Sequence, residues 1–136
     1  MSGECSDCGC EPEVILDVVF DRGLLFLTVA NIGNRPAHEV RIRFKRAFTG
    51  LGGTRKMHRL ALFERLEFLA PHKSIEVFLD RSASYFARRE PTTLTAAITW
   101  RTDGGERRKS SMTHDLEIYR DLAYIDREVP TRADPA

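Results

Sequence analysis

The sequence predicts an all-β domain, an immunoglobulin-like antiparallel sandwich of seven or eight strands. Three observations favour this class. Short runs rich in β-branched and aromatic residues are separated by turn-forming residues. One of these runs alternates apolar and basic residues without a break. Strands do not alternate with long amphipathic helices, which disfavours a doubly wound α/β fold. Two packed antiparallel sheets bury every second residue of such strands.

The first two predicted strands form a hairpin. Residues 14–20 (VILDVVF) and 24–30 (LLFLTVA) are rich in strand-forming residues and flank Asp-Arg-Gly at 21–23. Residues 31–36 (NIGNRP) are then dense in turn formers, because asparagine and glycine accept left-handed backbone conformations. The chain therefore turns back twice within its first forty residues.

The clearest strand covers residues 40–45 (VRIRFK). Successive side chains of a strand point to opposite faces, so Val40, Ile42 and Phe44 are expected in the core. The intervening basic residues, Arg41, Arg43 and Lys45, are then expected as an exposed row with about 6.8 Å from one to the next.

The second half of the chain is less uniform. Residues 60–69 (LALFERLEFL) are compatible with one helical turn followed by a strand, or with a strand that carries a bulge. A strand is predicted over 75–79, and one short helix over 82–90, ended by Pro91. A last hairpin pairs 92–101 with 109–118 around Asp-Gly-Gly at 103–105.

The chain is expected to hold one domain between two flexible tails. Residues 1–12 are acidic and Cys-rich without periodicity, 13–125 form the predicted sandwich, and 126–136 hold two prolines and alternating charges. The N-terminus lacks the early positive charge and apolar stretch of a secretory signal. No run approaches the roughly 18 apolar residues of a membrane span. We therefore expect a cytoplasmic protein that has no membrane partner.

Two segments carry a family resemblance. Residues 27–44 (LTVANIGNRPAHEVRIRF) combine a strand, an Asn-x-Gly turn, a small residue at Ala37 and a second alternating strand. Residues 66–75 (LEFLAPHKSI) follow the pattern leucine, apolar residue, proline, glycine, with His72 in the place of the glycine. Over roughly 24–118 the chain resembles the CARDB and related APHP-type domains of bacteria and archaea. The resemblance implies an adhesion, spacer or interaction module that is not an enzyme.

Charge is balanced overall but unevenly distributed. The formal net charge is +1, which gives no global attraction to nucleic acid or membrane. Residues 1–21 hold six acidic residues and no Lys or Arg, whereas 35–65 hold nine basic residues against two acidic ones. We predict partner-binding residues in the basic region, namely Arg41, Arg43, Lys45 and Arg46, facing an acidic protein surface. The alternative is an ordinary solvated outer face of the sheet.

Three cysteines form a C-x2-C-x-C cluster at Cys5, Cys8 and Cys10. Thiolates at this spacing can converge on zinc or another thiophilic metal, and one of the four histidines or a second chain would supply the fourth ligand. The cluster lacks the paired C-x2-C spacing of a complete zinc site, so a tail with three thiols is the alternative.

The remaining motifs do not support catalysis. The glycines of 50–53 lack the spacing and the following helix of a phosphate-binding loop. His114 lies beside hydroxyl residues, but no nucleophile-elbow pattern accompanies it. Trp100 is expected to be a packing residue.

The sequence thus predicts a non-enzymatic protein-interaction or scaffold module. Homo-oligomer formation is expected to use a sheet edge or a sheet face. Nucleic acid is disfavoured as a partner, because no aromatic residues for base stacking interleave the basic row. The alternative function is a metal-binding or redox accessory protein that uses the cysteine cluster.

Overall fold

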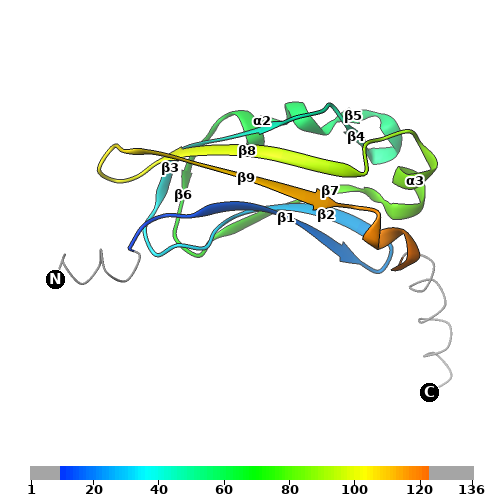
Figure 1. The fold of residues 1–136 in the computed structure, drawn as a ribbon, viewed down its shortest axis with the longest axis horizontal. Helices are drawn as coiled ribbons and strands as arrows, with labels where there is room; N and C mark the ends of the chain where they lie inside the picture. The colour runs from blue at the N-terminus through cyan, green and yellow to red at the C-terminus, as the bar shows by residue number, and fades with distance from the viewer. Residues whose placement is uncertain (1–9, 123–136) are drawn as a thin grey trace, which may run out of the picture.

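The structure is a computed structural model that describes residues 10–122, and it shows two stacked antiparallel sheets (Figure 1). One sheet has the order β1-β2-β7, and the other has the order β6-β3-β8-β9. The strands are β1 (Val14–Asp21), β2 (Leu24–Asn31), β3 (Ala37–Phe44), β6 (Leu66–Leu69), β7 (Ser74–Arg81), β8 (Thr93–Arg101) and β9 (Arg107–Asp115). The predicted all-β sandwich is confirmed.

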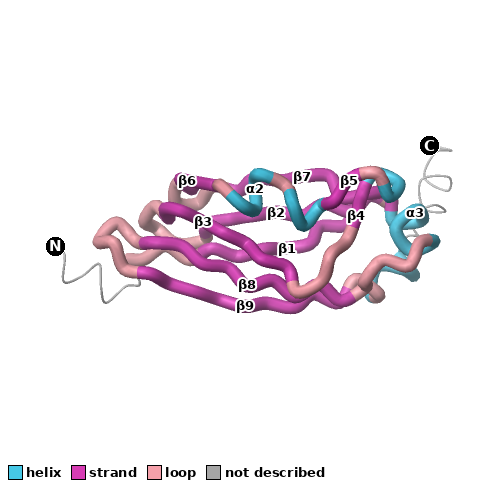
Figure 2. Tube along the Cα trace, turned by 90° about the horizontal axis from the view of Figure 1, so that it is seen from above, coloured by secondary structure: helices cyan, strands magenta, loops and turns pink. Residues whose placement is uncertain are grey.

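Short elements connect β3 to β6 and β7 to β8. The strands β4 (Thr49–Gly50) and β5 (Arg55–Lys56) pair with each other, and the 3-10 helices η1 (Leu51–Gly53) and η2 (Met57–Arg59) follow them in turn. Helix α2 (Ala61–Glu64) precedes β6, so residues 60–69 are one helical turn followed by a strand. The predicted short helix after β7 is α3 (Ser82–Ala87). Figure 2 shows α2 beside β3 and α3 at the far end of the sandwich.

The core lies between the sheets and follows the period of two. Val40 and Ile42 of β3 are buried, as are Leu94, Ile98 and Trp100 of β8. Fully burying such side chains contributes roughly 1.5–3 kcal/mol each. Trp100 is thus a packing residue, as predicted, and the inward-facing half of the alternating segment 40–45 is confirmed.

Turn chemistry sets the register of the first hairpin. Asp21 pairs with Leu24, so only Arg22 and Gly23 form the loop, and both have positive φ (52° and 83°). Two left-handed residues produce the type I′ turn, whose twist matches that of the flanking strands.

Asn31 ties three segments together at the other end of β2. Its buried side chain accepts hydrogen bonds at Oδ1 from the amides of Glu13 (3.1 Å) and Gly33 (2.9 Å). Its Nδ2 donates to the carbonyls of Arg35 (2.8 Å) and Leu69 (3.1 Å). At Gly33 a Cβ would lie 2.0 Å from the Glu11 carbonyl oxygen. The Asn-x-Gly pair therefore acts by fixing the backbone.

Packing against the sandwich begins before β1. Pro12 is buried, and the Glu11 carboxylate accepts two hydrogen bonds from the Arg108 guanidinium of β9 (3.0 and 3.1 Å). The predicted N-terminal extension of 1–12 thus contacts the domain through its last residues. The rest of that extension, residues 1–9, and the predicted C-terminal tail lie outside the described residues.

Side chains from β9 and from the residues that follow it cover the outer edge of β1. The Leu16 amide donates to Sδ of Met112 (3.2 Å), and its carbonyl accepts from Nε2 of His114 (2.6 Å). The Tyr119 hydroxyl donates to the Val18 carbonyl (3.3 Å). These bonds occupy backbone groups that an edge strand otherwise offers to another chain. His114 therefore has a structural partner on the core edge.

Candidate binding surface

The outward side chains of β3 differ from one another in their surroundings. Arg41 is half-buried and pairs with Glu67 of β6 (3.3 Å), and it also donates to its neighbouring Val40 carbonyl (3.0 Å). Arg43 is exposed and has no carboxylate within ion-pair distance among the described residues. Because an exposed pair such as Arg41–Glu67 contributes only about 0–1 kcal/mol, Arg41 is only slightly less available than Arg43.

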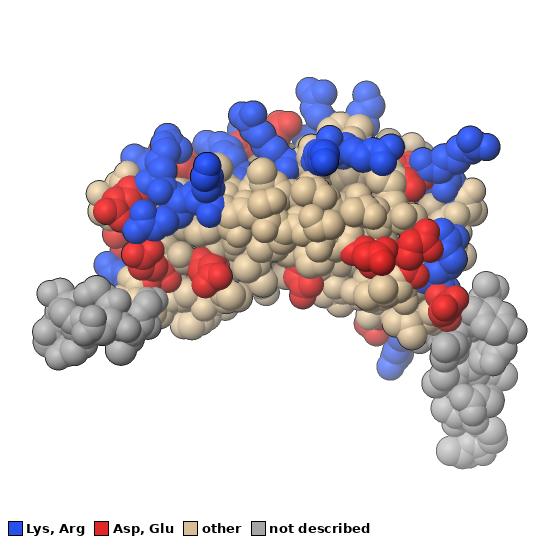
Figure 3. Space-filling view, viewed as in Figure 1, with Lys and Arg blue, Asp and Glu red and all other residues tan. Residues whose placement is uncertain are grey.

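Several exposed basic residues of β3, and of the segment that leads to β6, lack an ion pair. Within residues 10–122, six of them have no carboxylate within ion-pair distance: Arg43, Lys45, Arg46, Arg55, Lys56 and Arg65. Figure 3 shows Lys and Arg gathered along the upper side of the molecule, where Figure 1 places β3, α2 and β5, with most Asp and Glu lower down. We call these six residues the basic surface.

A hollow of about 470 Å³ lies next to the basic surface, between β3 and the helices that follow. It is lined by residues 41–44 of β3, by His58 of η2, and by Phe63 and Glu64 of α2. The Phe44 and Phe63 rings meet edge to face with centroids 5.0 Å apart. Nδ1 of His58 lies 3.3 Å from the Phe48 carbonyl oxygen, which holds the ring in place. The hollow thus combines an aromatic wall with two arginines.

A cluster of paired charged residues fixes the segment between β3 and β6 on the sandwich. The buried Asp80 carboxylate binds the Arg88 guanidinium (2.8 Å) and accepts from the Gly52 amide (3.1 Å). Arg88 also donates to the Thr49 carbonyl (3.2 Å) and pairs with Glu90 (3.4 Å). Every charge in the cluster has a partner, so its role is structural.

Thr49 sets the charge state of the remaining carboxylate in this cluster. Burial alone would raise the pKa of Glu90, but hydrogen bonds from the Thr49 hydroxyl and amide, together with Arg88, outweigh it and lower that pKa. Glu90 is therefore ionised at neutral pH and holds β4 in position. No local pattern predicts this cluster, because its members lie up to 41 residues apart.

The glycine loop at 50–53 is part of the same anchor. The Gly52 amide is bound by Asp80, and a Cβ at Gly50 would lie 2.2 Å from the Leu79 carbonyl oxygen. A carboxylate of the chain itself thus uses this loop amide.

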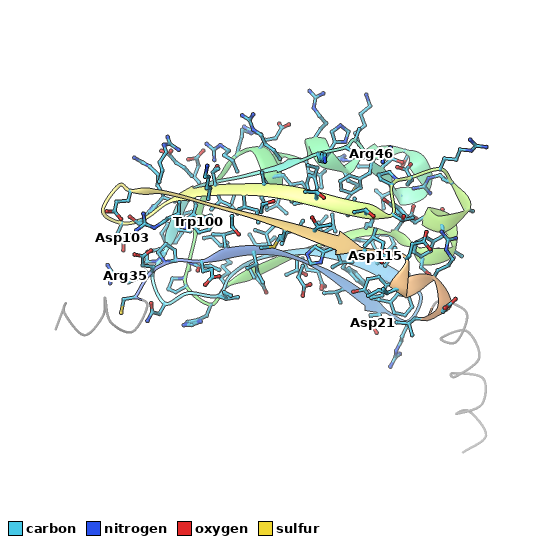
Figure 4. All side chains as sticks on the ribbon, viewed as in Figure 1. Asp21, Arg35, Arg46, Trp100, Asp103 and Asp115 are labelled. Atoms are coloured by element: carbon cyan, nitrogen blue, oxygen red, sulfur yellow. The ribbon has the colours of Figure 1, made fainter. Side chains whose placement is uncertain are left out.

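Cys10 and a second ionic cluster lie at the β8–β9 turn. Asp103 binds Arg35 (2.7 Å) and Nε2 of His38 (2.9 Å), and Figure 4 shows Arg35 and Asp103 side by side there. The hydrogen bond with His38, followed by the Arg35 charge, lowers the pKa of Asp103. Cys10, Arg35 and Asp103 line a hollow of about 340 Å³.

Of the three cysteines predicted to bind a metal, only Cys10 lies within the described residues. Among the described residues, no three Cys, His, Asp or Glu side chains form a metal-binding group. Cys5 and Cys8 lie outside the described residues. Of the four histidines, His38 is the one bonded to Asp103, a carboxylate that lines the same hollow as Cys10. The prediction that Cys5, Cys8 and Cys10 hold a metal stays a prediction.

Within residues 10–122, no helix is long and apolar enough to cross a lipid bilayer. A comparison with curated proteins gave no match to the chain. The family model described as "Domain of unknown function (DUF8453)" matches residues 8–120, which include the whole sandwich and all six residues of the basic surface. The chain therefore belongs to the DUF8453 family.

Proposed function

We propose that this protein is a non-enzymatic interaction module that binds an acidic protein partner through the basic surface. One observation carries the proposal: six exposed cations share one side of the molecule, and no carboxylate of residues 10–122 neutralises them. Charges left unpaired on a rigid surface attract an oppositely charged partner and orient it. The resemblance to CARDB and APHP-type domains, which are interaction modules, supports the same function, and the expected cytoplasmic location stays part of the proposal.

The rest of the molecule supports this choice by contrast. Many other charged groups are paired with one another, as in the Asp80–Arg88–Glu90 cluster and the Arg35–Asp103–His38 cluster. Sandwich surfaces need polar residues for solubility, but that need is met equally well by mixed charges. A group of six unpaired cations, in a chain of net charge +1, favours recognition over simple solvation.

The test compares two double charge reversals that change net charge equally. Lys45→Glu/Arg46→Glu alters the basic surface, and Lys73→Glu/Arg81→Glu alters two exposed cations of the other sheet and its β6–β7 turn. Poly-L-glutamate is the probe, and fluorescence anisotropy gives the dissociation constant. We expect the first variant to bind about tenfold or more weakly, which is about 1.4 kcal/mol, and the second to stay within about twofold of wild type.

Two outcomes would contradict the proposal. Equal losses in both variants would show that only net charge matters. Tighter binding of a single-stranded DNA oligonucleotide of matched charge would assign the surface to nucleic acid instead of protein.

Metal binding by Cys5, Cys8 and Cys10 is the second candidate function. The supporting observation is that Cys10 shares a hollow with Asp103, which is bonded to His38, a residue type that completes such sites. A carboxylate bonded to one nitrogen of a histidine is the usual support for a ligating imidazole. Purification of the full chain under reducing conditions, followed by elemental analysis, tests it. About one equivalent of zinc, lost in a Cys5→Ser/Cys8→Ser variant, is expected, and less than about a tenth would end the idea.

A further inference from the structure

The basic surface borders a length of strand edge that lacks a partner. β6 pairs with β3 at Ala37, His38 and Val40, and it begins only at Leu66. The following part of β3, residues 41–44, pairs with β8 on one side but has no strand on the other. Helix α2 contacts β3 on that side, and the hollow of about 470 Å³ lies beside this contact.

The hydrogen-bond parity shows which backbone groups face the hollow. The Lys45 amide donates to the Thr95 carbonyl of β8 (2.9 Å), so the Lys45/Thr95 pair is hydrogen-bonded. In an antiparallel ladder every second pair has this form, which makes Arg43/Ala97 and Arg41/Thr99 hydrogen-bonded pairs as well. The amides and carbonyls of Ile42 and Phe44 therefore point away from β8, toward the hollow.

The hollow reaches this edge. Ile42, backbone included, is 2% exposed, yet it lines the hollow, so its backbone groups lie just below the surface there. No hydrogen bond from a loop residue or a side chain of residues 10–122 reaches the Ile42 or Phe44 backbone. Edge groups of this kind bind another strand unless they are covered.

We propose that an extended acidic segment of the partner adds as a strand along residues 41–44 of β3. This inference rests on the function proposed above and names the form in which the partner binds. Main-chain hydrogen bonds to Ile42 and Phe44 would supply affinity, as in other cases of strand addition. Residues directly opposite in a sheet share a face, so partner residues opposite Arg41 and Arg43 lie on the outer face beside two guanidinium groups.

The geometry defines the chemistry of the added segment. Acidic residues are favoured opposite Arg41 and Arg43, and apolar residues are favoured opposite Ile42 and Phe44, next to the aromatic wall of Phe63. A segment that alternates acidic and apolar residues fits this pattern. Four residues span about 13 Å, at roughly 3.3 Å for each residue. The fit to an alternating segment distinguishes strand addition from general attraction of anions.

The test uses the synthetic peptide Glu-Val-Glu-Val-Glu-Val and two N-methylated versions of it, with the full-length protein. Valines opposite Ile42 and Phe44 would direct their amides at β3, whereas glutamate amides would point away. We expect methylation of the valine amides to weaken binding about tenfold or more, and methylation of the glutamate amides to change it by less than about threefold. Amide hydrogen exchange at Ile42 and Phe44 should slow when the unmethylated peptide binds.

The outcomes separate this inference from the proposed function. Equal binding of both methylated peptides, or unchanged exchange at Ile42 and Phe44, would overturn strand addition even if poly-L-glutamate still binds the basic surface. Loss of poly-L-glutamate binding itself would instead overturn the proposed function. Protection at other strands, such as β7, would place the peptide on a different edge and also contradict the inference.

Discussion

The segment between β3 and β6 has paired charges on one side and unpaired charges on the other. On its inner side, Asp80, Arg88 and Glu90 form a cluster in which each charge has a partner. On its outer side, Lys45, Arg46 and Arg55 are exposed and have no carboxylate partner in residues 10–122. The inner side fixes the segment on the sandwich, and the outer side leaves its charges available. The paired charges hold the fold together, and we propose that the unpaired ones serve recognition.

The two strand edges repeat this contrast. Met112, His114 and Tyr119 bind backbone groups of β1, whereas no hydrogen bond from a loop or side chain of residues 10–122 reaches the backbone of Ile42 and Phe44 beside the hollow. Covered edges disfavour pairing with another strand, and we propose that the unpaired part of β3 accepts a partner strand. We therefore expect the Asp80–Arg88–Glu90 cluster and the covered edge of β1 to stabilise the fold, and the basic surface to contribute little to stability.

The largest expected effect on stability comes from Asp80→Ala. This change leaves the Arg88 guanidinium with one carboxylate and removes the acceptor of the Gly52 amide. Removing one partner of a buried ion pair typically costs about 3–5 kcal/mol, and the partial exposure of Arg88 places this case near the lower end. Urea denaturation gives the free energy of unfolding. A loss below about 1 kcal/mol would show that the cluster does not anchor the segment.

A smaller loss is expected for His114→Ala, which uncovers the β1 edge. The Leu16 carbonyl loses its donor, at a cost of about 1–2 kcal/mol. His38→Ala is the control, because its partner Asp103 is exposed and keeps Arg35, so we expect less than about 1 kcal/mol. Equal losses in the two variants would contradict a special role for the covered edge.

Tyr85→Phe tests the polar anchoring of α3 and its pH dependence. The Tyr85 hydroxyl donates to the Pro91 carbonyl (2.6 Å), and its loss is expected to cost about 1 kcal/mol. Burial, followed by the charge of Glu90, raises the pKa of Tyr85 above its ordinary value near 10. The unfolded chain therefore ionises first, so the stability contributed by Tyr85 is present below pH 10 and is lost as the pH rises further. Unfolding at a series of alkaline pH values should show a smaller decline in the variant, and parallel curves would contradict this cause.

The sequence predicted the regular parts of this fold because their signals are local. The Asp-Arg-Gly turn and the alternation of 40–45 each need only adjacent residues, and both hold in the structure. Local patterns also identify Asn31 as a turn residue, but its four side-chain hydrogen bonds join residues up to 38 apart and have no local signature. His72 stands where glycine was expected, and its φ of 62° is in the region that favours glycine.

The candidate site was predicted in part for the same reason. Arg43, Lys45 and Arg46 are exposed as alternation requires, whereas Arg41 is held by Glu67, a pairing that depends on where β6 lies. Residues 41–44 of β3 lack a neighbouring strand because β6 begins only at Leu66, after a helical turn that the sequence left undecided. The hollow with His58 and Phe63 exists only because η2 and α2 fold back beside β3. Long-range placement, rather than residue type, was the missing information.

The smallest expected effect on stability comes from changes in the basic surface. Lys45→Glu/Arg46→Glu should change the free energy of unfolding by less than about 0.5 kcal/mol, because neither side chain has an ion pair to lose. Urea denaturation of this variant beside Asp80→Ala compares the two sides of the segment directly. A loss as large as that of Asp80→Ala would show that the outer charges also serve the fold.

The salt dependence of poly-L-glutamate affinity tests most directly whether the unpaired cations form a recognition surface. Exposed charges are screened over about 8–10 Å at 0.1–0.15 M salt, so wild-type affinity should fall steeply as salt rises. The Lys45→Glu/Arg46→Glu variant should show a weaker affinity and a clearly shallower dependence at unchanged stability. Identical slopes for wild type and variant would contradict the assignment of binding to this side of the molecule.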